Sequence, residues 1–201
     1  MPKISLGVPK LPWPKKGDEP FRSSRNARSE ARLDMASRTF SSYAIAYRQA
    51  AERLVSCALR SRTEYPDLAV LPVIFVYRHY LELALKNILC LGRRCSLGKV
   101  GMSKTHDLSE LWGQTRLVLE ELSPGNHPVE LAVVERCVLE FHRHDKSSEE
   151  SRYPVDKKGC RRSLQSLARV DLRNLKKGMV GVANFLDGCA DGVDYMNSNC
   201  Q

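Results

Sequence analysis

The sequence predicts an all-α protein, a bundle of four to five up-and-down helices preceded by an extended basic arm. In several long stretches, apolar residues recur at three- and four-residue steps, which is the period of one helix face. The clearest stretch covers residues 71–91 and reads LPVIFVYRHYLELALKNILCL. In contrast, residues 1–26 contain five prolines and several basic residues. Proline lacks an N–H donor and disrupts helix interiors, so this part is expected to be extended.

Length and composition indicate one globular core. A chain of 201 residues is long enough for one well-buried hydrophobic core but short for two separate domains. Hydrophobic residues make up 42% and charged residues 27%, which is ordinary for a soluble domain. No continuous apolar run approaches the ~20 residues of a membrane span, and the N-terminus has no apolar core of a secretory signal. We therefore expect a cytoplasmic protein without a membrane partner.

Positive charge is concentrated near the N-terminus. Residues 1–62 hold thirteen Lys and Arg against five acidic residues, whereas the other 139 residues are almost balanced, although the whole chain carries +9. A basic arm favours a polyanionic partner, most simply nucleic acid. The alternative is a solvated arm that only keeps the protein soluble. Trp13 and Phe21 are the arm's large apolar side chains, and they could dock onto a protein partner or onto the body of the chain.

The predicted organisation has three parts: an arm over residues 1–26, a helical bundle over 27–190 and a tail over 191–201. Five segments have helical periodicity, with approximate bounds 27–62, 67–91, 105–122, 128–143 and 171–188. Thr105 and Asp171 are the residue types that cap helix N-termini, and Pro128 suits a first helical position. Gly92 and Gly188 are placed to end their helices.

The central helix carries a charged ladder. Arg78, Glu82 and Lys86 follow one another at four-residue spacing, which brings opposite charges together on one side of a helix. We expect intrahelical ion pairs. The seven cysteines contain no CxxC pair, so neither a zinc site nor a disulfide framework is indicated, and no cofactor is expected.

Three short motifs carry a family resemblance. They are YRHYLELALKNIL around Arg78, THDLSELW around His106, and the later Asp145…Ser148…Arg152-Tyr153-Pro154. In order and spacing these resemble the HEPN superfamily of small helical proteins, over roughly residues 40–190. The resemblance implies an HEPN-like helical bundle, a homodimer, and an RNA-targeting effector in a toxin or anti-phage defence setting.

Many HEPN proteins are metal-independent ribonucleases whose signature is an Arg followed, after four to six residues, by a His. Arg136 and His142 match that pattern, so the resemblance implies that they are catalytic. Histidine can transfer protons near neutral pH, and arginine can hold a phosphate through paired N–H donors. Cys137 departs from the family, in which a polar residue often follows the Arg. His144 is a second candidate for the histidine role, and Arg78, Arg152 and Tyr153 would bind substrate at the cleft.

Each of these residues also has a structural interpretation. Arg136 could be a solvated residue opposite the apolar helix face, and His142 a helix-end residue favoured by the C-terminal dipole. His106 more often has a structural role at a helix start. Arg152 and Tyr153 could anchor a loop. The alternative function is therefore a non-catalytic module that binds a protein or nucleic acid, or a subunit of a larger complex.

Overall fold

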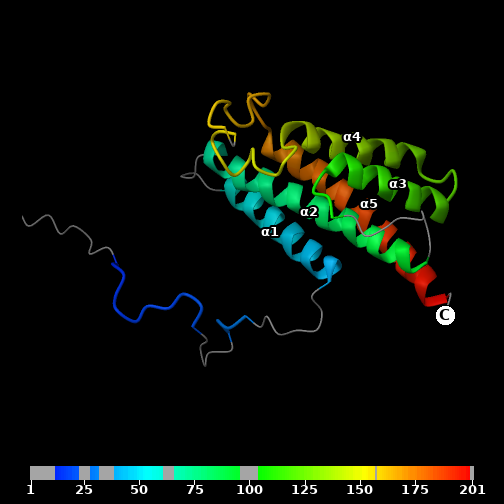
Figure 1. The fold of residues 1–201 in the computed structure, drawn as a ribbon, viewed down its shortest axis with the longest axis horizontal. Helices are drawn as coiled ribbons and strands as arrows, with labels where there is room; N and C mark the ends of the chain where they lie inside the picture. Colours follow the sequence, from blue (N-terminus) through cyan, green and yellow to red (C-terminus); the bar gives the residue numbers. More distant parts are fainter. Residues whose placement is uncertain are drawn as a thin grey trace, which may run out of the picture. The chain divides into compact units, whose positions relative to one another are not determined.

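The computed structural model describes residues 12–22, 28–31, 39–60, 66–95, 104–156 and 158–199. Within these residues it is all-helical and contains no strand, apart from one isolated bridge between Val155 and Arg162. The helices are α1 (Phe40–Arg60), α2 (Pro66–Arg94), α3 (Leu108–Leu122), α4 (Pro128–His144) and α5 (Leu172–Asn199). The predicted all-α bundle is confirmed (Figure 1). The chain divides into two compact units, residues 1–36 and residues 37–201.

Helix α2 is the centre of the bundle, and α1, α3 and α5 all pack directly against it (Figure 1). Leu81, Leu85 and Ile88 on α2 are fully buried, as the periodicity predicted. By length and hydropathy alone, α2 could cross a membrane, since its most apolar window has a mean hydropathy of 1.5. However, 56% of that window is buried inside the bundle, which is the environment of a core helix.

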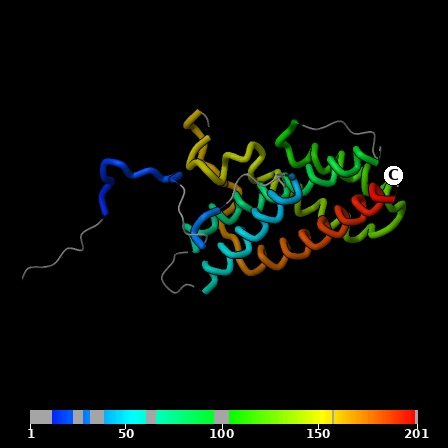
Figure 2. The backbone as a smooth tube through the Cα atoms, turned by 90° about the horizontal axis from the view of Figure 1, so that it is seen from below, coloured from blue at the N-terminus to red at the C-terminus, as the bar shows by residue number. Residues whose placement is uncertain are grey.

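The helix directions depart from a simple up-and-down order. The carbonyl of His106, just before α3, accepts a hydrogen bond from Arg78 in the middle of α2, and Gly92 near the end of α2 faces Val118 on α3. Helices α2 and α3 therefore run parallel. The connection between them, residues 95–107, is long enough to join the end of one helix to the start of a parallel neighbour. Helix α5 also runs parallel to α2 and extends along the bundle to the C-terminus (Figure 2).

Three predicted helix ends were wrong. Residues 28–31 are not helical, and the first described helix begins at Phe40; the other positions of the predicted start, 27 and 32–38, lie outside the described residues. Gly188 does not end the last helix, which continues to Asn199 because Val193 is fully buried in the core. Gly92 lies inside α2, at the closest approach of that helix to α3.

Side chains and proline set three other helix starts. Asp107, and not Thr105, caps α3, because its carboxylate accepts hydrogen bonds from the N–H groups of Ser109 and Glu110 at 2.9 and 3.1 Å. The hydroxyl of Thr105 instead accepts a hydrogen bond from the N–H of Asp107. The predicted cap of α5 is confirmed, since Asp171 accepts from the N–H groups of its first turn. Pro128 starts α4 as predicted.

In the described part of the arm, residues 15–18 form a turn. The N–H of Asp18 donates to the carbonyl of Lys15 at 3.0 Å, and the Asp18 carboxylate accepts from the N–H of Lys15 at 2.7 Å. Gly17 has a φ of 96°, which glycine adopts without a steric penalty. Trp13 and Phe21 flank this turn with their rings exposed. The arm thus presents two aromatic side chains.

Replacing Gly92 tests the close packing of α2 on α3. A Cβ at residue 92 would lie 2.7 Å from Cγ1 of Val118, closer than carbon atoms approach. We expect Gly92→Ala to lower the free energy of unfolding by about 1–3 kcal/mol, the usual cost of overpacking. The matched control is Gly188→Ala on α5, where nothing lies within 4 Å and helix propensity favours alanine by about 1 kcal/mol. Urea denaturation measures both, and equal stability of the two variants would contradict this packing.

Candidate nucleic-acid interface on helix α2

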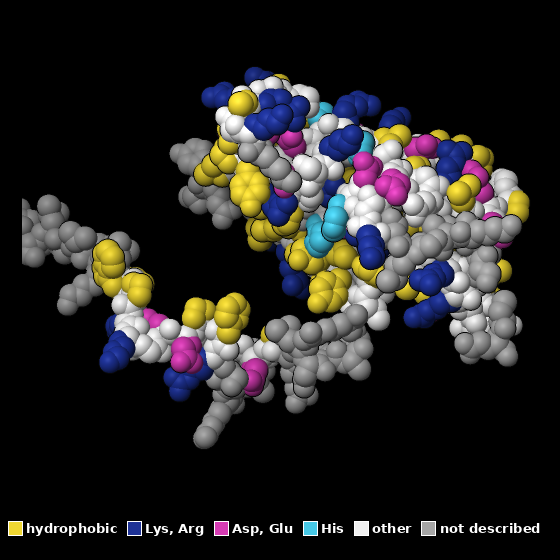
Figure 3. All heavy atoms as spheres, viewed as in Figure 1, with side chains coloured by type: hydrophobic (Ala, Val, Ile, Leu, Met, Phe, Trp, Pro, Cys, Tyr) yellow, Lys and Arg dark blue, Asp and Glu magenta, His cyan; other side chains and the backbone are white. Residues whose placement is uncertain are grey.

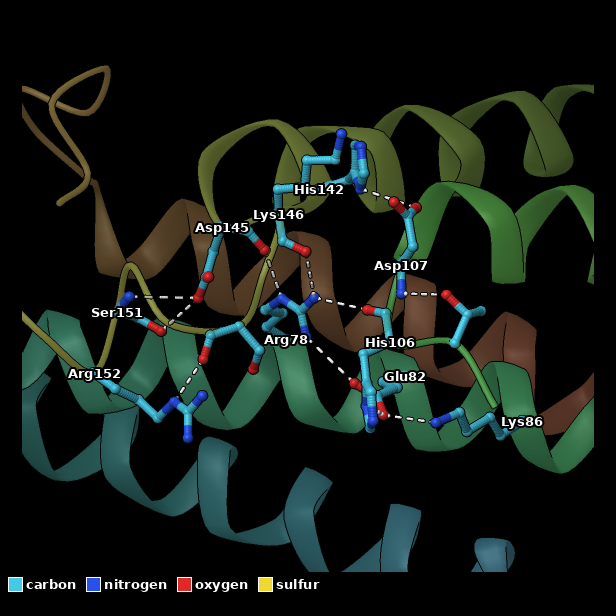
Figure 4. Close-up of polar contacts among 12 residues, drawn as sticks. Arg78, Glu82, Lys86, His106, Asp107, His142, Asp145, Lys146, Ser151 and Arg152 are labelled. Carbon is cyan, nitrogen blue, oxygen red and sulfur yellow. Dashed lines mark hydrogen bonds and ion pairs between the residues drawn. The ribbon is translucent and has the colours of Figure 1, made fainter. Parts of the chain in front are cut away.

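A buried arginine joins α2 to two loops. The Arg78 side chain is 0% exposed. Its Nε donates to the carbonyl of Asp145 at 2.7 Å, and its Nη2 donates to the carbonyls of His106 and Lys146 at 2.9 and 3.2 Å. Figure 4 shows the guanidinium between the loop that precedes α3 and the loop that follows α4. Arg78 therefore holds both loops against α2 and is not exposed to a substrate.

Glu82 is the negative centre of this cluster. Its carboxylate lies 3.4 Å from Nη1 of Arg78, 2.8 Å from Nζ of Lys86 and 2.7 Å from Nδ1 of His106. Burial alone would raise the pKa of Glu82, but its hydrogen bonds with Lys86 and His106, and their charges, outweigh that effect and lower the pKa. Glu82 is thus a carboxylate at neutral pH. The predicted intrahelical ion pairs of Arg78, Glu82 and Lys86 are confirmed.

The carboxylate fixes the orientation of His106. An ionised carboxylate only accepts hydrogen bonds, so Nδ1 of His106 must carry the proton that faces Glu82. In the neutral ring the other nitrogen, Nε2, is then unprotonated and can accept a proton from a ligand. The His106 side chain is 72% exposed. This gives an accessible imidazole in a defined tautomer, held by a buried carboxylate.

A second buried carboxylate shapes the loop after α4. The Asp145 side chain accepts from the hydroxyl of Ser151 at 2.7 Å and from the N–H of Glu150 at 3.0 Å. Asp145 as a whole is 0% exposed. The next two residues, Arg152 and Tyr153, are both exposed, and Arg152 lies beside Phe75 in the first half of α2.

Phe75, His79, Glu82 and Lys86 form one face of α2, which we call the α2 stripe. Their spacing of four, three and four residues keeps them on one side of the helix. The Arg152 guanidinium lies 5.5 Å from the centre of the Phe75 ring and 5.6 Å from that of Tyr153. At the other end, His106 sits on Glu82. Figure 3 shows histidine and hydrophobic side chains side by side on this view of the bundle.

His79 links the aromatic side chains of the stripe. Its ring stacks on Phe75 with centroids 6.1 Å apart and an interplanar angle of 5°, and the ring of Tyr47 of α1 meets it edge-on with centroids 4.4 Å apart. Burial lowers the pKa of His79 below its usual 6.5; Glu82 opposes this, while the positive charges of Arg78 and Lys86 add to it. His79 is therefore a neutral aromatic ring at pH 7.

The structure does not join the two residues of the ribonuclease signature within one chain. Arg136 is exposed on the outer side of α4, whereas Nδ1 of His142 lies 3.3 Å from the Asp107 carboxylate at the start of α3. They are six positions apart, which places them about 120° apart around the helix. His144 points elsewhere, and its Nδ1 lies 2.7 Å from the hydroxyl of Ser166. Arg152 and Tyr153 lie together, on the α2 stripe.

Sequence reasoning missed the pairing of His106 with Glu82 and the part played by Phe75. The pair joins residues 24 positions apart, and no local pattern reveals that contact. The spacing of Phe75 and His79 ahead of Glu82 and Lys86 was a usable signal, because it continues the charged ladder toward the helix start. Among the described residues, no group of three His, Cys, Asp or Glu side chains could hold a metal ion.

Comparisons with known proteins give no match: no family model, curated protein or solved structure resembles this chain at a significant level.

Removing the central arginine should destabilise the bundle. Arg78→Met leaves the carbonyls of Asp145 and His106 without their donor and removes one of the positive charges near Glu82. We expect a loss of about 3–5 kcal/mol in the free energy of unfolding, typical for breaking a buried charge network. Arg116→Met is the control, since Arg116 makes exposed ion pairs and should change stability little. Urea denaturation distinguishes the two; an equal, small effect would mean that Arg78 does not hold the loops.

The Glu82 carboxylate should also leave a signature in the pH dependence of stability. Its pKa in the folded protein is below the ordinary 4.5, so its contribution is present above about pH 4.5 and is lost as the pH falls through the folded value. Glu82→Gln should be less stable than the parent at pH 7, and the difference should shrink at lower pH. Thermal unfolding between pH 3 and 7 measures this, and a pH-independent difference would contradict it.

Proposed function

We propose that this protein is an RNA-targeting effector that binds single-stranded RNA along the α2 stripe. The observation that carries the proposal is the sequence of side chains on this face: Tyr153, Arg152 and Phe75 at one end, then His79, then Lys86 and His106. Proteins that bind single strands combine aromatic rings, on which bases stack, with cations that follow the phosphates. This face offers both: the rings are those of Phe75, His79 and Tyr153, and the exposed cation is Arg152, whereas Lys86 is only 11% exposed and is paired with Glu82.

The dimensions of the stripe suit a short single strand. Phe75 and Lys86 are eleven positions apart, which corresponds to about 16 Å along a helix. The rim of the stripe is positive, because Arg152 is exposed and makes no ion pair among the described residues. Tyr153 is 56% exposed, so its ring is available to a base. The basic arm, with its excess of Lys and Arg, would add sequence-independent attraction to phosphate.

The pairing of His106 with Glu82 favours a catalytic form of this function, metal-independent RNA cleavage. In that reaction Nε2 of His106 would take the proton of a ribose 2′-hydroxyl, the 2′-oxygen would attack the adjacent phosphorus, and the bond from phosphorus to the 5′-oxygen would break. The 5′-oxygen would take a proton from a water molecule, and the protonated His106 would return its proton to the resulting hydroxide. The products would be a 2′,3′-cyclic phosphate and a 5′-hydroxyl. The Glu82 carboxylate would hold the ring and stabilise its protonated state.

Two further parts of the proposal rest on the HEPN resemblance alone. One is the setting, a toxin or anti-phage defence system. The other is a homodimer in which Arg136 of one chain would complete a site with His142 of the other, since the two lie on different sides of α4. A non-catalytic module that only binds RNA or a protein partner is the alternative, and the cleavage experiment below separates it from a nuclease.

RNA binding is tested with single-residue variants of the stripe. Loss of one stacking or cation–π partner should weaken binding of a single-stranded RNA about tenfold, within the range of about 1–3 kcal/mol per stacked base. We expect this for Arg152→Ala and for Tyr153→Ala. Arg173→Ala removes the same charge from an exposed position at the start of α5 and is the control. Fluorescence anisotropy at fixed salt measures affinity. Equal losses in Arg152→Ala and Arg173→Ala would mean that RNA binds through nonspecific charge attraction and not along the α2 stripe.

Cleavage is tested in EDTA with a labelled RNA and the same RNA made with 2′-deoxyribose at every position. If His106 is the base, His106→Ala should reduce cleavage at least 100-fold, as expected for loss of a general base, while the deoxy substrate stays intact with the parent protein. Arg136→Ala and His142→Ala are assayed in parallel. Loss of activity in these two variants, with His106→Ala unaffected, would place the catalytic residues on α4. If the parent protein does not cleave RNA, only the RNA-binding function would stand.

A further inference from the structure

A groove adjoins the α2 stripe on the side of α1 and α5. It encloses about 760 Å³ and is bordered by the start of α1, the second half of α2 and the last part of α5. This volume is within the ~300–1,000 Å³ typical of small-ligand sites. His79 belongs both to the stripe and to the groove wall. A strand of RNA lying on the stripe would therefore pass the mouth of this groove.

The groove has aromatic walls. Phe40 and Tyr43 of α1 and His79 of α2 all line it, and Tyr43 is 47% exposed. Flat rings of this kind provide a surface on which an unstacked nucleobase can lie. The groove also contains Leu83 and Leu91, which would contact the apolar faces of such a base.

The polar lining has a defined hydrogen-bonding character. Asp191 and Asp194 of α5 lie three residues apart, on the same side of the helix, and both line the groove. Within the described residues, neither carboxylate forms an ion pair, and the side chain of Asn87, which lines the groove from α2, forms no hydrogen bond. The exposed guanidinium of Arg94 and the hydroxyl residues Thr39 and Ser41 complete the polar lining. Ionised carboxylates only accept hydrogen bonds, whereas an amide can also donate.

We infer that this groove binds a guanine base of the RNA that lies on the α2 stripe; the inference rests on the RNA-binding function proposed above. Among the four bases, guanine alone presents two adjacent donors on its Watson–Crick edge, N1–H and N2–H, next to the acceptor O6. The carboxylates of Asp191 and Asp194 are acceptors for the two donors, and the amide of Asn87 and the guanidinium of Arg94 are donors for O6. Adenine, cytosine and uracil each place an acceptor next to their one Watson–Crick donor, so a pair of carboxylates would repel them.

The first experiment measures base preference in the full-length protein. Three oligouridines of equal length carry one central guanosine, inosine or adenosine, and anisotropy gives the affinity of each. We expect the guanosine oligomer to bind about tenfold tighter than the adenosine oligomer, as for one good paired contact. Inosine lacks the N2 amino group and should fall between them. Equal affinity for guanosine and adenosine would overturn the guanine assignment while leaving RNA binding intact.

Variants then assign the preference to the groove. Asp191→Asn and Asp194→Asn should each reduce the preference for guanosine over adenosine at least threefold, without weakening the binding of plain oligouridine. The same substitution at the exposed Asp67 of α2, outside the groove, is the control and should keep the preference. An unchanged preference in both α5 variants would place guanine recognition elsewhere.

A second readout does not depend on RNA binding. Guanosine monophosphate titrated into ¹⁵N-labelled protein should shift the side-chain amide signal of Asn87 and the backbone signals of α5 around Asp191, whereas adenosine monophosphate should not. These shifts would support the groove even if no RNA bound to the stripe, in which case only the stripe proposal would fail. Equal shifts with both nucleotides, or none with either, would overturn the guanine site.

Discussion

The buried guanidinium of Arg78 is the interaction on which the rest of the structure depends. A charged group without water must be neutralised and must use its hydrogen-bond donors. Arg78 does this through three backbone carbonyls and Glu82. Two of these carbonyls belong to the loop after α4 and one to the loop before α3. One side chain on α2 therefore fixes the position of both loops. It thereby fixes where α3 begins and where α4 ends.

This constraint explains why ionisable side chains that could bind a ligand or transfer protons gather on α2. Lys86 and His106 lower the pKa of the buried Glu82 and keep it ionised, and the ionised Glu82 in turn orients His106. At the other end of the cluster, the backbone of Asp145 binds Arg78 while its side chain folds the turn that places Arg152 over Phe75. The structural network and the proposed RNA-binding face therefore share residues, and a change in the network would move the face.

The sequence was sufficient to predict the helices but not their relative directions. Periodicity marked the buried faces of α2, α3 and α5, because burial repeats with the helix turn. The ends were harder: Gly92 and Gly188 resemble helix terminators, yet one is required where α2 approaches Val118 and the other lies in a helix that continues because Val193 has a buried place. The contact of His106 with Glu82 spans two elements, so it follows from the parallel arrangement of α2 and α3, which no local pattern encodes.

The sequence pointed to a catalytic motif on α4, whereas the structure brings the candidate site residues together on α2. A motif of Arg, five residues and His is defined along the chain, but a helix rotates about 100° per residue, so its two ends lie on different sides unless another chain or loop reunites them. The motifs around Arg78, His106 and Arg152 are far apart in sequence and converge in one cluster. Convergence from three elements requires a specific fold, whereas two residues on one helix require only composition. For this chain, we therefore give the α2 cluster more weight in the functional proposal than the signature on α4.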